Sequence, residues 1–327
     1  MRLSWYRHGR TMASDERATA ASPFDKADAD LVLRSSDNID FFVSRAIMAL
    51  ASPIFADMFI VAEQTSASAR SAATACGSDA PAVDLTEHGR GLDNFLRFIY
   101  PVKNPVIEKL EDALDVLEVA SKYMVDHIAE EASKRFEMLA EEQPLRAYAL
   151  AYICRREDAM RIAAKVSLLY PWPESTRNII EELGTTINAA LIRLQEYHTA
   201  CGAAASSVTR AEWETTLNAP PSLETRPLFA WTHRSVWRNH PLPRFHYVAH
   251  AWWKASLEKL EKIVQSTPHP RVTTTQAFFG TFLANAMPES SIPGNALCSA
   301  LLSFMRVYTT NVEAAVSEVR LTSGQQQ

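Results

Sequence analysis

Apolar and polar residues change from a strand-like to a helical period within residues 24–100, and this stretch organises the rest of the chain. Two short runs, Leu31–Arg34 and Ile39–Val43, either alternate apolar and polar residues or are short and apolar, as half-buried strands are. The four residues between them, Ser-Ser-Asp-Asn at positions 35–38, are all turn formers. The pattern therefore predicts a β-hairpin over residues 31–43.

Beyond the hairpin, the apolar residues recur at spacings of three and four, which is the period of an α-helix. Ser52-Pro53 marks the start of a second helix, because proline is favoured at the first helical position. We expect this second helix to end at Phe59, and a strand to follow at Ala82–Leu85. The residues at helical spacing are Ala46, Ile47, Leu50, Ile54, Phe55, Met58 and Phe59.

Further helices complete the pattern up to residue 140. One ends at Pro101, another runs through the apolar positions between residues 113 and 124, and a third starts at Asp126 and ends near Leu139. We predict that these helices share one hydrophobic core with the strands. The predicted core residues are Leu31, Leu33, Phe41, Val43, Ile47, Phe55, Phe59, Leu96, Ile99 and Leu117.

The strand pattern disappears after Pro144, and residues 145–170 have the pattern of two helices with one apolar face. Gly184 is typical of a helix end, and residues 186–197 resume the helical period. We expect a helical extension over residues 141–200, a linker-like segment over residues 201–227 and a helical C-terminal domain over residues 228–320.

Two segments lack a clear period. Residues 1–22 are predicted to be a flexible N-terminal segment. Residues 64–81 are rich in Ser, Ala and Thr and are predicted to be an inserted loop. The last helix is expected at Asn295–Arg320, with a core face of Leu297, Leu301, Leu302, Met305 and Tyr308.

The order of these elements resembles that of a BTB/POZ domain over residues 23–140. The resemblance is carried by Ser-Arg-Ala-Ile-Met-Ala-Leu-Ala-Ser-Pro-Ile-Phe-Ala-Asp-Met-Phe at positions 44–59 and by Phe-Leu-Arg-Phe-Ile-Tyr at positions 95–100. It is greatest to the version found in fungal proteins of a basidiomycete-like type. Many members have His-Lys or His-Arg where this chain has Ser44-Arg45. The resemblance implies an α+β fold, in which short helices cover a small mixed sheet, followed by an all-helical C-terminal region.

Charge is unevenly divided along the 327 residues. Residues 23–142 carry a net charge of −11, with 22 acidic and 11 basic side chains, whereas residues 143–327 carry +4 and residues 1–22 carry +2. An acidic N-terminal domain argues against DNA binding by that domain. The chain contains only 9 glycines, which weighs against a glycine-rich phosphate loop.

The sequence also bears on the compartment. No apolar run approaches the ~20 residues of a membrane helix, and the first twenty residues lack the apolar centre of a secretory signal. Four scattered cysteines (Cys76, Cys154, Cys201 and Cys298) are typical of free thiols in a reducing compartment. We therefore expect an intracellular protein, in the cytoplasm or nucleus, with no membrane partner.

No catalytic pattern is found: the chain has no Gly-x-Ser-x-Gly turn, phosphate loop or His-Glu-x-x-His helix. Two spacings suit a metal, namely His198 with Cys201 and His246 with His250. Neither pair has a second close pair of ligands, so we interpret these residues as part of the fold and not as metal ligands. We expect no enzyme activity, no metal and no cofactor.

The resemblance implies a non-enzymatic interaction module that pairs with another BTB domain, with a homodimer as the expected form. The helix that carries Ala46, Ile47 and Leu50 would lie at the dimer face. An alternative is a substrate adaptor of a cullin-type ubiquitin ligase. Cullin-binding relatives have a hydrophobic-x-Glu motif after the second helix, where this chain has Val61 and Glu63.

A third interpretation concerns Arg226–Lys254, which contains no Asp or Glu and interleaves basic with aromatic residues. Such a composition suits single-stranded nucleic acid, with Arg234, Arg238 and Arg244 as the phosphate ligands. Burial of an aromatic ring is the stronger contribution, because each ring removes roughly 150–250 Å² from water. We therefore favour a structural segment in which Trp231, Trp252 and Trp253 are mostly buried.

Overall fold

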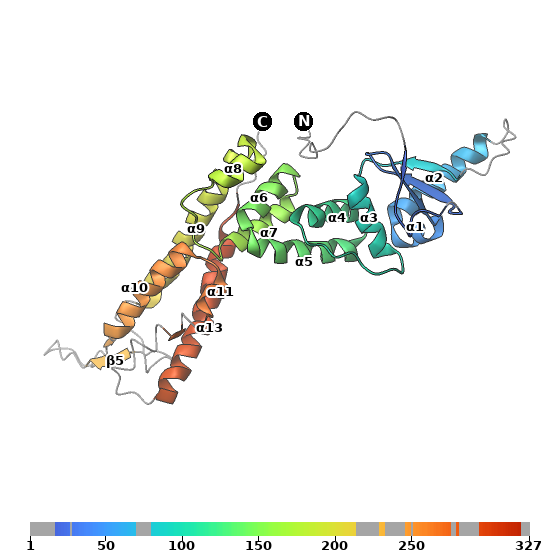
Figure 1. The fold of residues 1–327 in the computed structure, drawn as a ribbon. Helices are drawn as coiled ribbons and strands as arrows, with labels where there is room; N and C mark the ends of the chain where they lie inside the picture. Colours follow the sequence, from blue (N-terminus) through green and yellow to red (C-terminus); the bar gives the residue numbers. More distant parts are fainter. Residues whose placement is uncertain are drawn as a thin grey trace. The chain divides into compact units, whose positions relative to one another are not determined.

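A computed structural model of the chain describes residues 17–26, 28–69, 80–213, 229–232, 246–249, 251–275, 279–280 and 294–321. The chain divides into two compact units between Leu139 and Ala140. Strands and short helices make up the first unit, and helices dominate the second (Figure 1).

A four-stranded mixed sheet forms one layer of the first unit. Its strands are β1 (Ala18–Thr19), β2 (Leu31–Arg34), β3 (Ile39–Val43) and β4 (Ala82–Asp84). They lie in the order β1-β3-β2-β4, with β2 antiparallel to β3 and parallel to β4. The hairpin predicted from the sequence is confirmed at both strands, and its turn places Asn38 at a φ of 62°.

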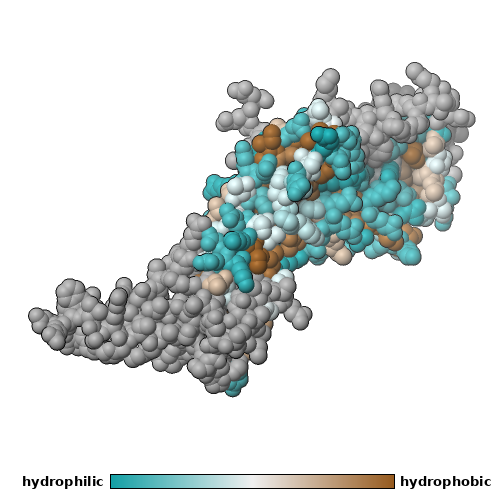
Figure 2. All heavy atoms as spheres, turned by 60° about the vertical axis from the view of Figure 1, so that its left-hand side comes forward, coloured by the Kyte–Doolittle hydropathy of each residue, from teal (hydrophilic) through white to brown (hydrophobic). Residues whose placement is uncertain are grey.

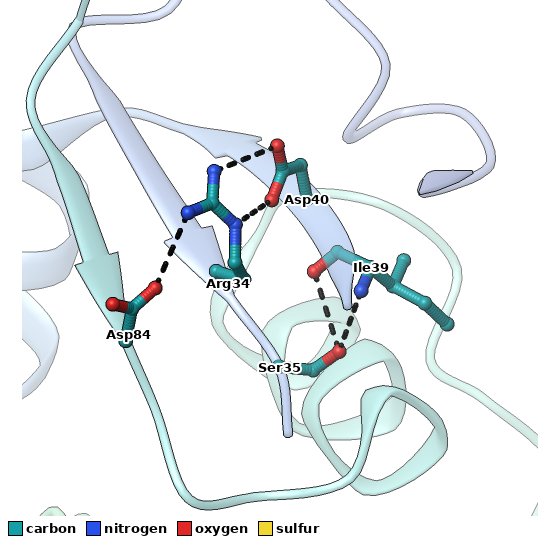
Figure 3. A network of polar contacts seen from close by, with 5 residues as sticks. All are labelled: Arg34, Ser35, Ile39, Asp40 and Asp84. Carbon is teal, nitrogen blue, oxygen red and sulfur yellow. Dashed lines mark hydrogen bonds and ion pairs between the residues drawn. The ribbon is translucent and has the colours of Figure 1, made fainter. Parts of the chain in front are cut away.

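A row of charged side chains crosses the sheet (Figure 3). Arg34 on β2 lies opposite Asp40 of β3 and Asp84 of β4. Its guanidinium donates from Nε to Asp40 Oδ1 at 2.7 Å, from Nη2 to Asp40 Oδ2 at 3.2 Å and from Nη1 to Asp84 Oδ1 at 3.3 Å. Because Asp84 is largely exposed, its ion pair with Arg34 adds little stability. The bidentate pair between Arg34 and Asp40 is stronger and fixes the register of the hairpin.

The prediction of a flexible segment over residues 1–22 is wrong for residues 17–22. Ala18 N–H donates to Asn38 O at 3.1 Å and Ala20 N–H to Asp40 O at 2.9 Å, which makes β1 a parallel edge strand beside β3. The chain then continues to Phe24, which is fully buried. Two residues are too short for any period to show in a sequence.

Helices cover the sheet and enclose the core of the first unit. They are α1 (Arg45–Ala51), α2 (Pro53–Ala69), α3 (Gly89–Ile99), α4 (Leu110–Lys122) and α5 (Asp126–Glu142). Eight of the ten predicted core residues are buried, and Ile47 and Ile99 are half-buried. The core continues onto α5 through Ile128, Ala132 and Phe136.

The predicted boundaries of α2 and of the inserted loop are wrong. The helix continues past Phe59 to Ala69, so residues 64–69 are helical and Val61–Glu63 lie inside α2 instead of after it. Residues 70–79 of the predicted loop lie outside the described residues. The extension has no apolar period, but its alanines favour a helix.

Tyr123 and Glu87 join distant parts of the first unit. The Glu87 carboxylate is buried, and it accepts a hydrogen bond from Lys122 Nζ at Oε1 and one from Tyr123 Oη at Oε2, the latter at 2.9 Å. Burial by itself would raise the pKa of Glu87, but the hydrogen bonds from Lys122 and Tyr123 outweigh burial and lower it. Burial and the Glu87 charge raise the pKa of the Tyr123 hydroxyl, which therefore stays protonated and donates.

The second unit begins with α6 (Pro144–Ile153), α7 (Glu157–Ser167), α8 (Arg177–Leu183) and the short 3₁₀ helix η1 (Thr185–Ile187). The predicted helical pair and the predicted stop at Gly184 are both confirmed. Gly184 has a φ of 89°, a conformation that costs glycine little, and its N–H donates to Ile180 O at 2.8 Å. Ala149, Ile187 and Leu191 form the local core.

The rest of the described second unit is built around the long helix α9 (Asn188–Trp213). Against it pack α10 (Ala251–Ser266) and α13 (Gly294–Glu318), and α11 (Pro270–Thr273) packs on α13. Because α9 runs without a break to Trp213, the linker-like segment predicted over residues 201–227 is wrong for residues 201–213. In the core, the Trp253 and Phe304 rings meet edge-on with their centroids 4.7 Å apart. The hydroxyl groups of Tyr308 and Thr209 form a hydrogen bond of 2.7 Å.

The sequence predicts that the region after residue 140 is wholly helical. Its described part is mostly helical but also contains strands. Strands β5 (Phe229–Thr232) and β6 (His246–Ala249) form a two-stranded antiparallel sheet. On α13, Leu301, Met305 and Tyr308 are buried as predicted, but Leu302 is 60% exposed. The side chain of Leu297 is outside the described part.

Gly202 lies where α9 and α10 approach most closely. A methyl group built on it would meet the backbone oxygen of Gln265 at 2.4 Å, which is shorter than any real contact. The helices can keep this separation only with glycine at position 202.

We expect Gly202→Ala to destabilise the second unit by about 1–3 kcal/mol, because α10 must move away from α9. Alanine has the higher helix propensity, so an effect of propensity alone would have the opposite sign. Urea unfolding followed by tryptophan fluorescence measures the change, with exposed Ser207→Ala on the same helix as the control. A Gly202→Ala protein as stable as the wild type would contradict the close approach.

We expect Tyr123→Phe to lower the stability of the first unit by about 1–3 kcal/mol near neutral pH, because Glu87 loses a buried donor. A lowered folded pKa means that Glu87 contributes stability above its unfolded pKa of about 4.3 and loses it as the pH falls through the folded value. The difference between wild type and Tyr123→Phe should therefore shrink in acid. Urea unfolding at neutral and acidic pH tests this, with half-exposed Tyr170→Phe as the control.

Candidate protein interaction surface

Helix α1 leaves part of its apolar surface in solvent. Within this seven-residue helix only Met48 is buried. Leu50 is 91% exposed, Ala46 is exposed and Ile47 is half-buried. Burying a leucine side chain contributes about 1.5–3 kcal/mol of stability, and Leu50 makes almost none of this contribution in the single chain.

Helix α2 also carries exposed apolar side chains. Phe55 and Phe59 point into the core, whereas Ile54, Ile60 and Val61 are 37%, 54% and 60% exposed. We call the set of Ala46, Leu50, Ile54, Ile60 and Val61 the α1–α2 face. Asp57 is exposed between these residues, one helical turn from Ile54 and from Val61.

The junction of the two helices is fixed from within. Ser52 is buried between α1 and α2, and its Oγ accepts from Phe55 N–H at 3.3 Å, as an N-cap does. The same hydroxyl donates to the backbone oxygen of Tyr123 at 2.6 Å. The Tyr123 ring stacks on Phe55 with centroids 4.5 Å apart. These contacts bind the start of α2 to the end of α4.

Arg45 fixes the start of α1 against the middle of α2. Its N–H donates to Asp30 Oδ1 at 2.6 Å, and its Nη2 donates to the backbone oxygen of Phe59 at 3.2 Å. The guanidinium carbon also lies 4.8 Å from the centroid of the Phe59 ring, within the range of a cation–π contact. Arg45 therefore helps to set the angle between the two helices.

Tyr100 holds the other side of the same start. Its hydroxyl accepts from Ser44 N–H at 2.6 Å. Burial raises the pKa of this hydroxyl, and the charge of Asp30 adds to the rise, so Tyr100 stays neutral. The residues around α1 are thus rigidly placed while its outer side chains remain exposed.

All five predicted partner-binding residues lie on α1 and α2. Ala46, Leu50 and Val61 are exposed there, and Ile47 is half-buried. Glu63 lies on α2, but its side chain is not among those described. Ile60 was not singled out from the sequence. The sequence nevertheless contains a sign of its exposure. Apolar pairs at 54–55, 58–59 and 60–61 cover more than one face of a helix, so not all of them can point into the core.

The other candidate sites are not brought together. Arg234, Arg238 and Arg244 lie outside the described residues, as do the side chains of Trp231 and Trp252. Trp253 is fully buried, as predicted.

The metal spacings do not produce a ligand set in the described part of the chain. The buried His198 pairs through Nε2 with Tyr170 O at 3.0 Å, and burial lowers its pKa. Burial raises the pKa of the Cys201 thiol to about 11. His246 lies on strand β6, not on a helix, and His250 is outside the described residues.

In the described part of the chain, no group of three or more His, Cys, Asp or Glu side chains is arranged to hold a metal ion. Among the helices described, none has an apolar stretch long enough to cross a membrane. Figure 2 shows hydrophobic residues in separate patches among hydrophilic ones on the face that it displays. What the α1–α2 face offers is apolar contact area, which suits the apolar surface of another protein.

Comparison with known proteins agrees with the fold of the first unit. Residues 23–138 match the model of the BTB/POZ domain family. No curated protein matches the chain. The match does not distinguish a fungal type, which stays a prediction. The α+β fold class predicted from the sequence is confirmed. Residues 23–138 of this chain therefore form a BTB/POZ domain, a protein–protein interaction module.

Proposed function

We propose that the chain is a non-enzymatic interaction protein that self-associates through the α1–α2 face of its BTB domain. The observation that carries the proposal is the exposure of Leu50, which is 91% exposed on a helix held rigidly at both ends. Ile54, Ile60 and Val61 extend the apolar surface onto α2. A rigid apolar surface loses little conformational entropy when it binds.

A second copy is a suitable partner for this face. In a two-fold symmetric dimer the same patch is used by both chains, so each apolar contact occurs twice. A stable interface buries about 800 Å² on each partner, more than five side chains supply. We therefore expect the face to be the centre of the interface, with polar residues of the BTB domain around it.

We expect Leu50→Asp to weaken self-association at least about 100-fold, because the dimer would bury two uncompensated carboxylates. Sedimentation equilibrium of the full chain gives the dissociation constant. Leu302→Asp is the matched control, since this leucine is exposed on α13 of the other unit and should leave association unchanged. A wild-type protein that is strictly monomeric at tens of micromolar would contradict the proposal.

A second candidate function is that of a substrate adaptor for a cullin-type ubiquitin ligase. It is favoured by Val61, which is 60% exposed two residues before Glu63. An apolar side chain could fill a groove on the cullin while the carboxylate pairs with a basic residue. Because both positions lie inside α2, the motif would be presented on a helix.

If the chain is such an adaptor, it should capture a purified cullin scaffold, and Glu63→Arg should weaken capture at least about tenfold by placing like charges together. Gln64→Arg places an arginine at the next position without removing a carboxylate and is the control. Capture that is equal for wild type and Glu63→Arg would show that Val61 and Glu63 are not the contact.

Two further interpretations stay predictions. Nucleic-acid binding through Arg234, Arg238 and Arg244 would require these side chains to share one exposed surface. An intracellular location, in the cytoplasm or nucleus, rests on the sequence alone.

A further inference from the structure

The BTB domain carries far more negative than positive charge. Residues 23–142 have a net charge of −11, and the full chain keeps −5. Part of its positive charge is used in ion pairs within the domain. Four of its cations pair with carboxylates of the same domain: Arg34 with Asp40, Arg90 with Asp112, Arg97 with Asp93 and Lys122 with Glu87.

The remaining carboxylates are largely at the surface. On α5, Asp126, Glu130, Glu131 and Glu137 are all exposed. The α1–α2 face is different, since Asp57 is the charged residue that lies among its apolar positions. Any partner that covers this face thus meets an apolar contact surface on an acidic domain.

We propose that the acidic charge of the BTB domain opposes self-association through the α1–α2 face, so that the dimer strengthens as ionic strength rises. The inference rests on the proposed self-association. Two copies bring two domains of net charge −11 together, and their repulsion acts over distances longer than the contacts. Salt shortens its range from about 10 Å at 0.1 M to about 3 Å at 1 M.

The sign of this salt effect distinguishes the two kinds of partner considered above. Apolar contact on the α1–α2 face does not depend on an attractive ion pair, so screening removes only the repulsion. A cullin contact that depends on Glu63 and a basic group would instead weaken as salt rises. Ionic strength would then shift the chain from a basic partner toward a second copy.

Sedimentation equilibrium of the full chain in about 0.1 M and about 1 M NaCl tests the proposal. We expect the dissociation constant of the dimer to fall about tenfold at the higher salt. The triple variant Glu130→Gln, Glu131→Gln and Glu137→Gln removes exposed charge on α5, outside the α1–α2 face. It should bind more tightly than wild type at low salt and respond less to salt, and circular dichroism checks that it is folded.

The outcomes separate the two claims. A wild-type dimer whose dissociation constant is unchanged or rises with salt overturns the charge inference and leaves self-association standing. A triple variant that binds no more tightly than wild type at low salt also overturns it. If wild type is monomeric at both salt concentrations, as Leu50→Asp is expected to be, the proposed function fails together with the inference.

Discussion

The buried contact between Glu87 and Tyr123 is the interaction on which the BTB domain most depends. A buried carboxylate is costly unless donors surround it, and Tyr123 and Lys122 are those donors. Tyr123 also stacks on Phe55 and accepts a hydrogen bond from Ser52 through its backbone oxygen. One residue at the end of α4 therefore fixes the segment that leads into α3 and the junction between α1 and α2.

This constraint explains how a small domain can keep apolar side chains in solvent without losing its shape. The core takes Phe55 and Phe59 from α2 and Met48 from α1, and the contacts of Ser52, Arg45 and Tyr123 settle the helix positions. Leu50 is then held outward by the backbone. The stability of the domain comes from the inner residues, which leaves the outer ones available for a partner.

The sequence predicts the parts of the fold whose signal is local. The hairpin is correct at both strands because Ser35–Asn38 and the flanking apolar runs lie within thirteen residues. Gly184 ends a helix because it adopts a positive φ, a conformation that costs glycine little. The outward position of Leu50 is implied by the family resemblance and not by the helical spacing, which shows that a residue is apolar but not which side the core occupies.

The errors arise where tertiary contacts override local signals. Gly202 is part of the segment predicted to be linker-like, but it lies inside α9, where the backbone of α10 comes too close for a larger side chain. The Glu87–Tyr123 contact joins residues 36 positions apart and has no local pattern. The four-residue strands β5 and β6 lie in an aromatic segment for which the sequence predicts a helical domain.

The central claim is that a second copy covers the α1–α2 face, and hydrogen–deuterium exchange of the full chain at rising protein concentration tests it most directly. We expect amides of residues 45–61 to become more protected over the concentration range in which the dimer forms, while those of α13 do not change. A dimer that forms without added protection of residues 45–61, or with protection confined to the second unit, would contradict it.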